Sequence, residues 1–433
     1  MTSPGSLLCF RAVMQQLFER PFNPDSPAGP ARVRTHRSFW NAWVIIFFMC
    51  FWSIAGSAAA GAEKARRTVI DSRGVEVRLP ERIERVATIS DGLIEGVMTV
   101  LGVSEKLVGI GSRSLKRVWS YQFEAAGGET FSYTGGMNPV LALNPRFADL
   151  PVFVEGPAIN YETLLSLKPD LVILRMGACN LTATDDRVHM VLDTLDSLDL
   201  PTVVLHGPYF SGKAHPQSIE REIRILGRVF EKPGPAAQLA AFIREKVRMV
   251  ENRTRDIPAA QRPRVLVLGL SSTAREKGGA GQVFGKDTME SYFIEEVVHA
   301  RNAFSSRGHF KLVNTEHLLA INPDVIVLCT AAAYHPPREL FEAPYYRHLR
   351  ELEAVRKRRV TALPWTPWNC EKRLEYPIDV MVMAKAAYPE RFADIELGSW
   401  VLDFYQGLYG VDRKTARKLR SAQWLDWTAS GPE

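Results

Sequence analysis

The chain has 433 residues, which is too long for one ordinary domain and enough for two. Hydrophobic residues make up 46% of it and charged residues 24%, the balance of a soluble globular protein. Half of the formal net charge of +6 falls in the first 62 residues. No basic stripe with interleaved aromatic residues follows, so we expect no nucleic-acid partner. The five cysteines form no CxxC pair and no zinc-like spacing.

The chain begins with the pattern of an export signal. Arginines precede the apolar run 39–56, and small residues follow it. A basic region, an apolar region and an A-x-A site together describe a secretory signal peptide. We therefore expect residues 1–62 to be a leader cleaved after Ala60 or Ala62, and the mature protein to be periplasmic. The run is also long enough to span a bilayer, so an uncleaved anchor is an alternative.

Seven apolar runs predict buried strands, and helical patterns lie between them. Continuous apolar strands are typical of parallel sheets whose two faces are both covered by helices. The alternation predicts an α/β fold built from doubly wound, mainly parallel sheets. The runs are residues 85–90, 106–112, 170–174, 202–206, 264–270, 324–329 and 359–365.

An internal repeat indicates two lobes of similar build. Residues 162–174 read ETLLSLKPDLVIL, and residues 316–328 read EHLLAINPDVIVL. In each copy we expect the Glu to begin a short helix, where its charge complements the helix dipole. The Leu pair should face the sheet, the Pro should end the helix, and the Asp should lead into a buried strand.

A single long helix is predicted between the lobes. Pro235 suits its first helical position, and five apolar residues follow with helical spacing. About 20 residues of helix span roughly 30 Å, enough to cross from lobe to lobe, although an ordinary helix packed on the first lobe fits the same pattern. We expect an N-terminal lobe at 63–232, an interlobe helix at 233–257, and a C-terminal lobe with C-terminal helices at 258–433. The five apolar residues are Leu239, Phe242, Ile243, Val247 and Val250.

These features resemble the helical-backbone class of periplasmic binding proteins, which serve ABC importers of ferric siderophores, haem and cobalamin. The opening segment 68–90, the two repeats, the interlobe helix and the closing segment 362–410 carry the resemblance. It implies a non-catalytic, monomeric receptor without an intrinsic cofactor. Such a receptor captures a metal chelate between its lobes and delivers it to a permease that works with an ATPase.

The resemblance also implies a role for the glutamate that begins each repeat. In such proteins one exposed Glu on each lobe docks into arginine pockets of the permease, and Glu162 and Glu316 occupy the matching positions. Two carboxylates held far apart on rigid helix starts would form orientation-fixing ion pairs with arginine. The alternative is that both residues only cap their helices.

The ligand is expected in the cleft, at the carboxyl ends of the strands. Aromatic residues in the loops there suit a large, flat ligand, and arginines suit an anionic chelate. The histidines show no HxxxH or HxH spacing, so a metal-ligating set is not identified. The segment 119–151 is longer than the resemblance leads us to expect and is a candidate for reshaping the pocket. The candidate ligand-binding residues are Trp119, Tyr133, Arg175, Tyr209, Arg275, Phe284, Tyr334, Trp365, Trp368 and Arg373.

Two other functional classes remain as alternatives. One is an exported bilobal metal-handling enzyme, but the sequence has no G-x-S-x-G elbow, P-loop or H-E-x-x-H motif, and we expect no enzyme. The other is a membrane-tethered sensor that keeps the apolar run as its anchor.

Overall fold

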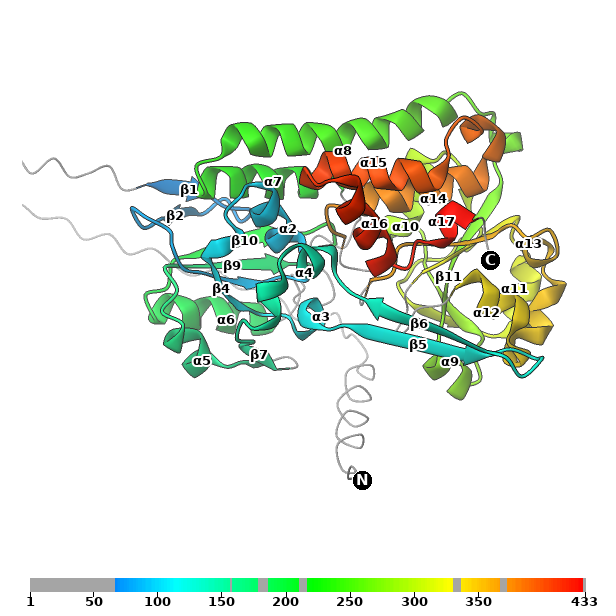
Figure 1. Cartoon of the computed structure of the whole chain (residues 1–433), viewed down its shortest axis with the longest axis horizontal. Helices are drawn as coiled ribbons and strands as arrows, with labels where there is room; N and C mark the ends of the chain where they lie inside the picture. Colours follow the sequence, from blue (N-terminus) through cyan, green and yellow to red (C-terminus); the bar gives the residue numbers. More distant parts are fainter. Residues whose placement is uncertain are drawn as a thin grey trace, which may run out of the picture. The chain divides into compact units, whose positions relative to one another are not determined.

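A computed structural model describes residues 67–155, 158–177, 186–209, 216–329, 336–366 and 372–430 (Figure 1). The predicted leader, with its apolar run and cleavage sites, lies outside these residues. Within the described part of the chain, no helix is both long and apolar enough to cross a membrane. Residues 63–433 form one compact unit that contains two separate sheets.

The first sheet, which defines the N-terminal lobe, has four parallel strands in the order β10-β9-β3-β4. Its strands are buried from end to end or nearly so, as expected for a sheet with helices on both faces. A short antiparallel pair, β1 (Thr68–Ile70) and β2 (Glu76–Arg78), opens the lobe. The strands of the sheet are β3 (Val86–Ile89), β4 (Leu107–Ile110), β9 (Leu171–Met176) and β10 (Thr202–His206).

Short helices and two hairpins complete the N-terminal lobe. One hairpin is the antiparallel pair β5 (Trp119–Glu124) and β6 (Thr130–Gly136), and the other is the pair β7 (Val154–Glu155) and β8 (Ala158–Ile159). The helices are α2 (Leu93–Val100), η1 (Ser104–Lys106), α3 (Arg113–Lys116), α4 (Pro139–Leu143), η2 (Pro145–Ala148), α5 (Tyr161–Ser166), α6 (Asp186–Ser197) and α7 (Gln217–Val229).

The second sheet, which defines the C-terminal lobe, has six strands in the order β14-β12-β11-β15-β16, with β13 beside β11. Strands β11, β13, β15 and β16 are parallel, whereas β12 and β14 are antiparallel to their neighbours. The predicted mainly parallel sheet therefore acquires an antiparallel edge here. The strands are β11 (Arg264–Leu270), β12 (Gly281–Val283), β13 (Arg301–Asn302), β14 (Lys311–Val313), β15 (Val325–Leu328) and β16 (Val360–Ala362).

The last helices of the chain return from the C-terminal lobe to the first one. Helix α15 packs on α2, and α16 packs on α4 and β6. The helices of this half are η3 (Ala259–Gln261), α9 (Ser272–Glu276), α10 (Met289–Tyr292), the π-helical turn η4 (Phe293–Val297), α11 (Thr315–Ile321), α12 (Pro337–Glu342), η5 (Pro344–Glu351), α13 (Glu353–Arg356), α14 (Tyr376–Ala387), η6 (Pro389–Phe392), α15 (Leu397–Tyr409), α16 (Arg413–Ala422) and α17 (Trp427–Ser430).

The long helix α8 (Pro233–Thr254) connects the two lobes along one edge of the molecule (Figure 1). It begins at Pro233, the first residue of the predicted range 233–257, so Pro233 and not Pro235 takes the first helical position, where a proline has no N–H to lose. It packs on α7 of the N-terminal lobe and on α14 and η4 of the C-terminal lobe. Leu239, Ile243 and Val250, on its predicted apolar face, are buried.

The two sequence repeats form the same local structure. Each helix begins after an asparagine whose side chain accepts a backbone hydrogen bond, from Thr163 N to Asn160 (2.9 Å) and from His317 N to Asn314 (2.8 Å). The first leucine of each pair is fully buried. The prediction that both leucines face the sheet is wrong for Leu165, which is 42% exposed, whereas Leu319 of the second repeat is partly buried against the core of its lobe. Adjacent side chains on a helix point about 100° apart, so the second leucine lies at the edge of the buried face.

The aspartate of each repeat fastens its strand to the neighbouring strand. Asp170 Oδ2 accepts from Arg85 N (2.8 Å), just before β3, and Asp324 Oδ2 accepts from Arg264 N (2.7 Å), at the start of β11. The same arginines then donate to carbonyls at the end of the repeat helices, Arg85 to Leu167 O (2.6 Å) and Arg264 to Asn322 O (3.3 Å). The Pro-Asp pair thus fixes where each lobe's central strand begins.

We predict that Asp324→Ala destabilises the protein by about 1–2 kcal/mol, because the part-buried Arg264 N–H loses its acceptor. Urea unfolding followed by circular dichroism measures the loss. The control is Asp256→Ala, which removes a surface ion pair with Arg391 worth about 0–1 kcal/mol. Equal stabilities of the two variants would contradict the role assigned to Asp324.

Candidate functional site

The N-terminal lobe contributes the segment that follows β3, where the chain changes direction across the sheet. Strand β3 lies between β4 and β9, so its carboxyl end is the topological switch point, the usual ligand position in open α/β sheets. Gly92 there has φ 113°, which favours glycine, and it begins α2. A Cβ at Gly92 would lie 2.5 Å from Asn138 Nδ2 and 2.9 Å from Arg373 Cδ, so the two lobes meet closely over this residue.

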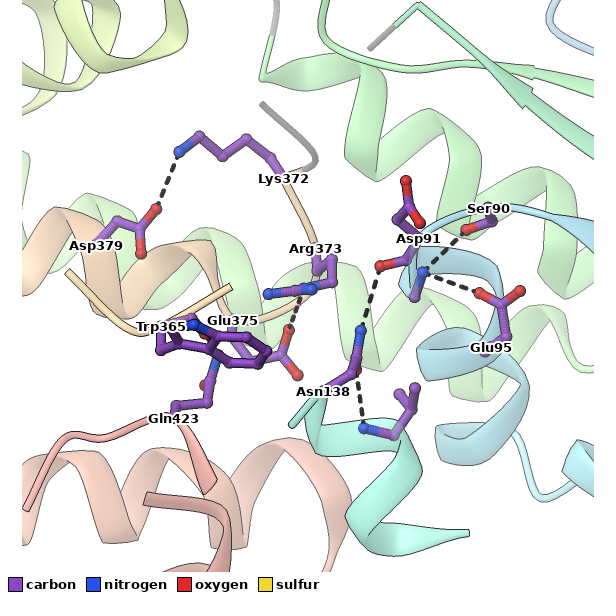
Figure 2. A network of polar contacts seen from close by, with 12 residues as sticks. Ser90, Asp91, Glu95, Asn138, Trp365, Lys372, Arg373, Glu375, Asp379 and Gln423 are labelled. Carbon is purple, nitrogen blue, oxygen red and sulfur yellow. Dashed lines mark hydrogen bonds and ion pairs between the residues drawn. The ribbon is translucent and has the colours of Figure 1, made fainter. Parts of the chain in front are cut away.

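Asp91 is held in place from both ends of the β5–β6 hairpin. Ser114 Oγ donates to Asp91 Oδ1 (2.7 Å), and Ser112 Oγ donates to the same oxygen; both serines precede β5. Asn138, which follows β6, donates from Nδ2 to Asp91 O (3.3 Å). Figure 2 shows the Asn138 amide directed at Asp91, while the Arg373 guanidinium points to the other side, toward Glu375. The loop after β3 is therefore rigidly built.

A buried glutamate lies beneath this loop. Glu95 accepts from Gly92 N (3.1 Å) and from Thr88 Oγ1, and none of its surface is exposed. Burial in a site without a neighbouring cation raises the pKa of Glu95 to about 7, although the hydrogen bond from Thr88 opposes the shift. The folded protein therefore holds a proton here that the unfolded chain releases at lower pH.

We predict that stability falls as pH rises from about 4.5 to about 7, the interval between the ordinary pKa of Glu95 and its raised one. Glu95→Gln should remove this dependence, which amounts to roughly 3 kcal/mol when fully developed. Urea unfolding at pH 5, 6, 7 and 8 compares the variant with the unaltered protein. Glu105→Gln, on an exposed residue, is the control. An unchanged slope in Glu95→Gln would contradict the assignment.

Arg373 is the contribution of the C-terminal lobe. It is only 6% exposed, and its Nε lies 4.0 Å from Glu375 Oε2, while Tyr409 OH donates to the other oxygen of Glu375. Its Nη1 is buried and has no hydrogen-bond partner in the described part of the chain. A buried N–H of a charged group normally has a partner, so Nη1 is a charged donor at this junction that a ligand can satisfy.

An aromatic cluster lies beside Arg373 (Figure 2). Trp365 is 2% exposed, with its ring centroid 5.8 Å from that of Trp119 and 5.3 Å from that of Trp424. The Tyr133 ring lies 6.0 Å from that of Trp424. Gln423 also fixes the Trp365 backbone, donating from Nε2 to Trp365 O (3.1 Å). Three of the candidate aromatic residues are thus brought together, and they pack on one another and on the C-terminal segment.

A second buried polar group joins the lobes next to this cluster. Tyr209, after β10, donates to Glu290 Oε2 (3.0 Å) and accepts from Met289 N (3.0 Å). Lys372 Nζ lies 2.9 Å from Glu290 Oε1 and 3.1 Å from Asp379 Oδ2. Burial alone would raise the pKa of Glu290, but the charge and hydrogen bond of Lys372, together with the charge of His309, hold that pKa below its usual value. Tyr209 therefore acts as a hydrogen-bonded contact between the lobes.

The remaining candidate residues lie elsewhere or outside the described residues. Arg175 forms a buried ion pair with Glu222 (2.7 Å) inside the N-terminal lobe. Arg275 donates to Tyr346 OH (2.6 Å) within the C-terminal lobe, and Phe284 is 1% exposed in the core. The two arginines are thus paired within their own lobes, whereas Phe284 packs on His309, whose ring stacks on Tyr209. Tyr334 and Trp368 lie outside the described residues.

Sequence reasoning did not single out several residues of this junction. Asp91 and Gly92 form a turn dipeptide after the first strand, Asn138 precedes a proline as a helix cap does, and Lys372 stands beside Arg373. Turn dipeptides, helix caps and neighbouring basic residues are common in loops, so these sequence features did not identify the residues as part of a binding site. Among the described residues, no group of three or more His, Cys, Asp and Glu side chains could hold a metal ion.

The two repeat glutamates are exposed at matching positions. Glu162 and Glu316 are each the second residue of a helix, two residues after its asparagine cap. The carboxylates therefore lie in the first helical turn, where the helix dipole stabilises negative charge.

A family model and a curated relative both match this chain over most of its length. The model of a family described as periplasmic binding proteins matches residues 96–366. The molybdate-binding protein MolA of Haemophilus influenzae is 23% identical over 359 residues, which cover 81% of this chain and 93% of MolA.

Solved structures agree with this comparison at the level of the fold. A periplasmic solute binding protein from Veillonella parvula superposes with a TM-score of 0.64 at 20% identity, covering 84% of this chain and 99% of that chain. MolA bound to molybdate gives 0.60 at 20% identity, covering 80% and 98%. Helicobacter pylori CeuE with Ni(II) bound gives 0.57 at 14% identity, covering 81% and 98%. The predicted bilobal α/β fold is thereby confirmed.

Proposed function

Since the chain belongs to the periplasmic binding protein family of ABC transporters, we propose that it captures an anionic, metal-containing ligand between its lobes. The observation that carries this proposal is the buried Arg373, whose Nη1 has no partner among the described residues. A guanidinium with an unused donor in a water-excluded junction suits a carboxylate, catecholate or oxyanion. The ligand is then delivered to a permease and its ATPase.

The relatives support a metal-containing ligand. By their names, MolA binds molybdate and the CeuE structure contains Ni(II). An anionic ferric siderophore and a metal oxyanion share the negative charge that Arg373 would recognise, and we propose this class. Since no acidic or histidine cluster for a bare metal ion is found in the described part of the chain, we place the charge recognition on Arg373.

The packing of the aromatic residues favours a compact ligand over haem or cobalamin. The ring of Trp365 is already covered by Trp119 and Trp424, so it offers little open face for a flat macrocycle. We propose that these rings form one wall beside Arg373 and exclude water from it, which strengthens the electrostatic attraction to an anion.

We further propose that Glu162 and Glu316 dock into arginine pockets of the permease. Their equivalent positions on α5 and α11 would present one carboxylate from each lobe, so that the spacing of the pair reports the relative position of the lobes. Exposed charges at the edge of an interface steer and orient the binding partner more than they increase its affinity.

The proposal includes export and the absence of catalysis. We propose that residues 1–62 direct the chain to the periplasm and that the protein works there as a monomer without an intrinsic cofactor. Mass spectrometry of the exported protein would show a new N-terminus after Ala60 or Ala62. An intact leader would instead support the membrane-tethered sensor.

The direct test is a titration of the mature protein followed by tryptophan fluorescence. The panel contains ferric siderophores, ferric citrate, molybdate, haem, cobalamin and free divalent metals. We expect saturable quenching by an anionic chelate or an oxyanion at micromolar or lower concentration. A response only to free divalent metals, or to haem or cobalamin, would contradict the proposed ligand class. No change in fluorescence with any ligand of the panel would favour the alternative hypothesis of a metal-handling enzyme.

A further inference from the structure

The β5–β6 hairpin belongs to the N-terminal lobe but packs on the C-terminal one. Its inward side chains alternate with exposed polar ones along both strands, the pattern of a sheet with one buried face. Phe123 is 4% exposed within the core of the C-terminal lobe, and it stacks on Phe131, its partner across the hairpin, at 5.4 Å. The Arg338 guanidinium, from α12, lies 4.5 Å from the centre of the Phe131 ring.

Hydrogen bonds fasten the hairpin at its tip and at its base, and Tyr121 between them is hydrogen-bonded to Glu339 and Tyr345. At the tip, Ala126 N donates to Glu342 O (2.9 Å), at the end of α12. At the base, Met137 N donates to Ala422 O (2.9 Å), and Trp424 Nε1 donates to Thr134 O (2.9 Å). An isolated two-stranded hairpin is marginally stable in water, so its order depends on this contact with the C-terminal lobe.

The hairpin and α8 connect the lobes along different edges. In Figure 1, α8 runs along one long edge of the molecule and β5–β6 along the other, with the two sheets between them. Helix α8 is a continuous part of the chain with a buried apolar face. The hairpin is a separate two-stranded sheet with an exposed outer face. Because it shares no strand with the two larger sheets, it can detach without breaking either of them.

The same hairpin is directly linked to the junction between the lobes. Ser112 and Ser114 before β5, and Asn138 after β6, all bond to Asp91. Asn138 also lies beside Gly92, over which Arg373 packs. Because Arg373 Nη1 has almost no accessible surface, nothing reaches it until a covering element moves.

We propose that β5–β6 is a releasable clasp that holds the lobes closed over the Arg373 junction. Detaching its aromatic face from the C-terminal lobe permits the lobes to separate, and docking it closes them and restores the positions of Asp91 and Asn138. The clasp adds a further connection to those made by α8, by the last helices α15 and α16, and by Tyr209. This inference depends on the contacts between the lobes and not on the identity of the ligand.

The test measures the distance between the lobes in the chain from residue 63 onward, without ligand. Spin labels are attached at Met190→Cys on α6 and Leu312→Cys on β14, two exposed residues on different lobes, with Cys179 and Cys370 replaced by serine. Pulsed electron paramagnetic resonance then gives the distribution of distances. Circular dichroism confirms that each variant is folded.

Two variants weaken the clasp in different ways. Ala126→Pro removes the amide that donates to Glu342 O, and its position as the second residue of the turn Ala125–Gly128 accepts proline. Phe123→Ser removes apolar contact with the C-terminal lobe. The control is Gln122→Ser, which changes an exposed neighbour on the same strand.

We expect both weakening variants to at least double the population at longer distance, and Gln122→Ser to leave the distribution unchanged. Identical distributions in folded Ala126→Pro and in the unaltered chain would overturn the proposal. If Phe123→Ser does not fold, Ala126→Pro decides the question alone, because it leaves the aromatic face intact.

Discussion

Reversing the charge of both repeat glutamates, in the variant Glu162→Arg/Glu316→Arg, should lower uptake at least tenfold while leaving ligand affinity in solution unchanged. Both residues are exposed and lie on helices of two different lobes, outside the Arg373 junction. Arginine in their place would meet the proposed permease arginines as a like charge, which costs several kcal/mol for each close pair. Uptake in intact cells and fluorescence titration of the purified protein measure the two effects separately.

The matched control places the same change at other exposed carboxylates near the starts of short helices. Glu105→Arg/Glu390→Arg alters one residue in each lobe, on η1 and η6, and should leave uptake unchanged. A loss of ligand affinity in Glu162→Arg/Glu316→Arg would show that these residues support the binding site instead. Normal uptake by that variant would show that both residues only begin their helices.

Replacing Arg373 by alanine should weaken ligand binding about 30-fold or more, because a buried charged anchor contributes about 2 kcal/mol or more. Arg373→Lys keeps the charge but loses the planar fork, so it should recover only part of the affinity. The measurement is a titration with the ligand identified from the panel. The protein should remain folded, since the variant loses only the 4.0 Å ion pair of Nε with Glu375, and Nη1 has no partner among the described residues to lose.

The control for charge alone is Arg275→Ala, an arginine of the same lobe that donates to Tyr346 OH. It should lower stability and leave affinity unchanged. If Arg373→Ala binds as tightly as the unaltered protein, Arg373 is not the anchor. If Arg275→Ala and Arg373→Ala lose ligand affinity equally, the loss is caused by the lower net charge of the protein and not by removal of a contact at the Arg373 junction.

The sequence predicted those parts of the fold that depend on local pattern. All seven apolar runs overlap strands, and two of these strands, β10 and β11, coincide with the predicted residues. The Pro-Asp repeats also form equivalent structures, because short-range caps and backbone bonds determine them. Leu165 departs from its prediction because the spacing within a two-turn helix, and not hydrophobicity, decides which leucine is buried.

The junction was less predictable because its residues meet across long sequence separations. Arg373 and Trp365 follow from the rule that ligands bind at strand ends, whereas the approach of Gly92 and Asn138 to Arg373 depends on how the lobes pack. Aromatic and polar residues alternate along β5 and β6, so the sequence indicates one apolar face of the hairpin. No local sequence feature indicates that this face covers the other lobe. Trp424 in the C-terminal segment likewise acquires its role by long-range contacts, with Trp365 and with the β5–β6 hairpin.

Equilibrium dialysis followed by elemental analysis tests the central claim most directly. The mature protein and Arg373→Ala are dialysed in parallel against the anionic chelate or oxyanion selected by fluorescence, and the bound metal is counted per chain. We predict one metal atom per chain for the unaltered protein at saturating ligand. At a ligand concentration near the dissociation constant of the unaltered protein, Arg373→Ala should hold at least tenfold less metal than the unaltered protein does. Equal metal content in the two proteins, or none in either, would contradict an anion site at Arg373.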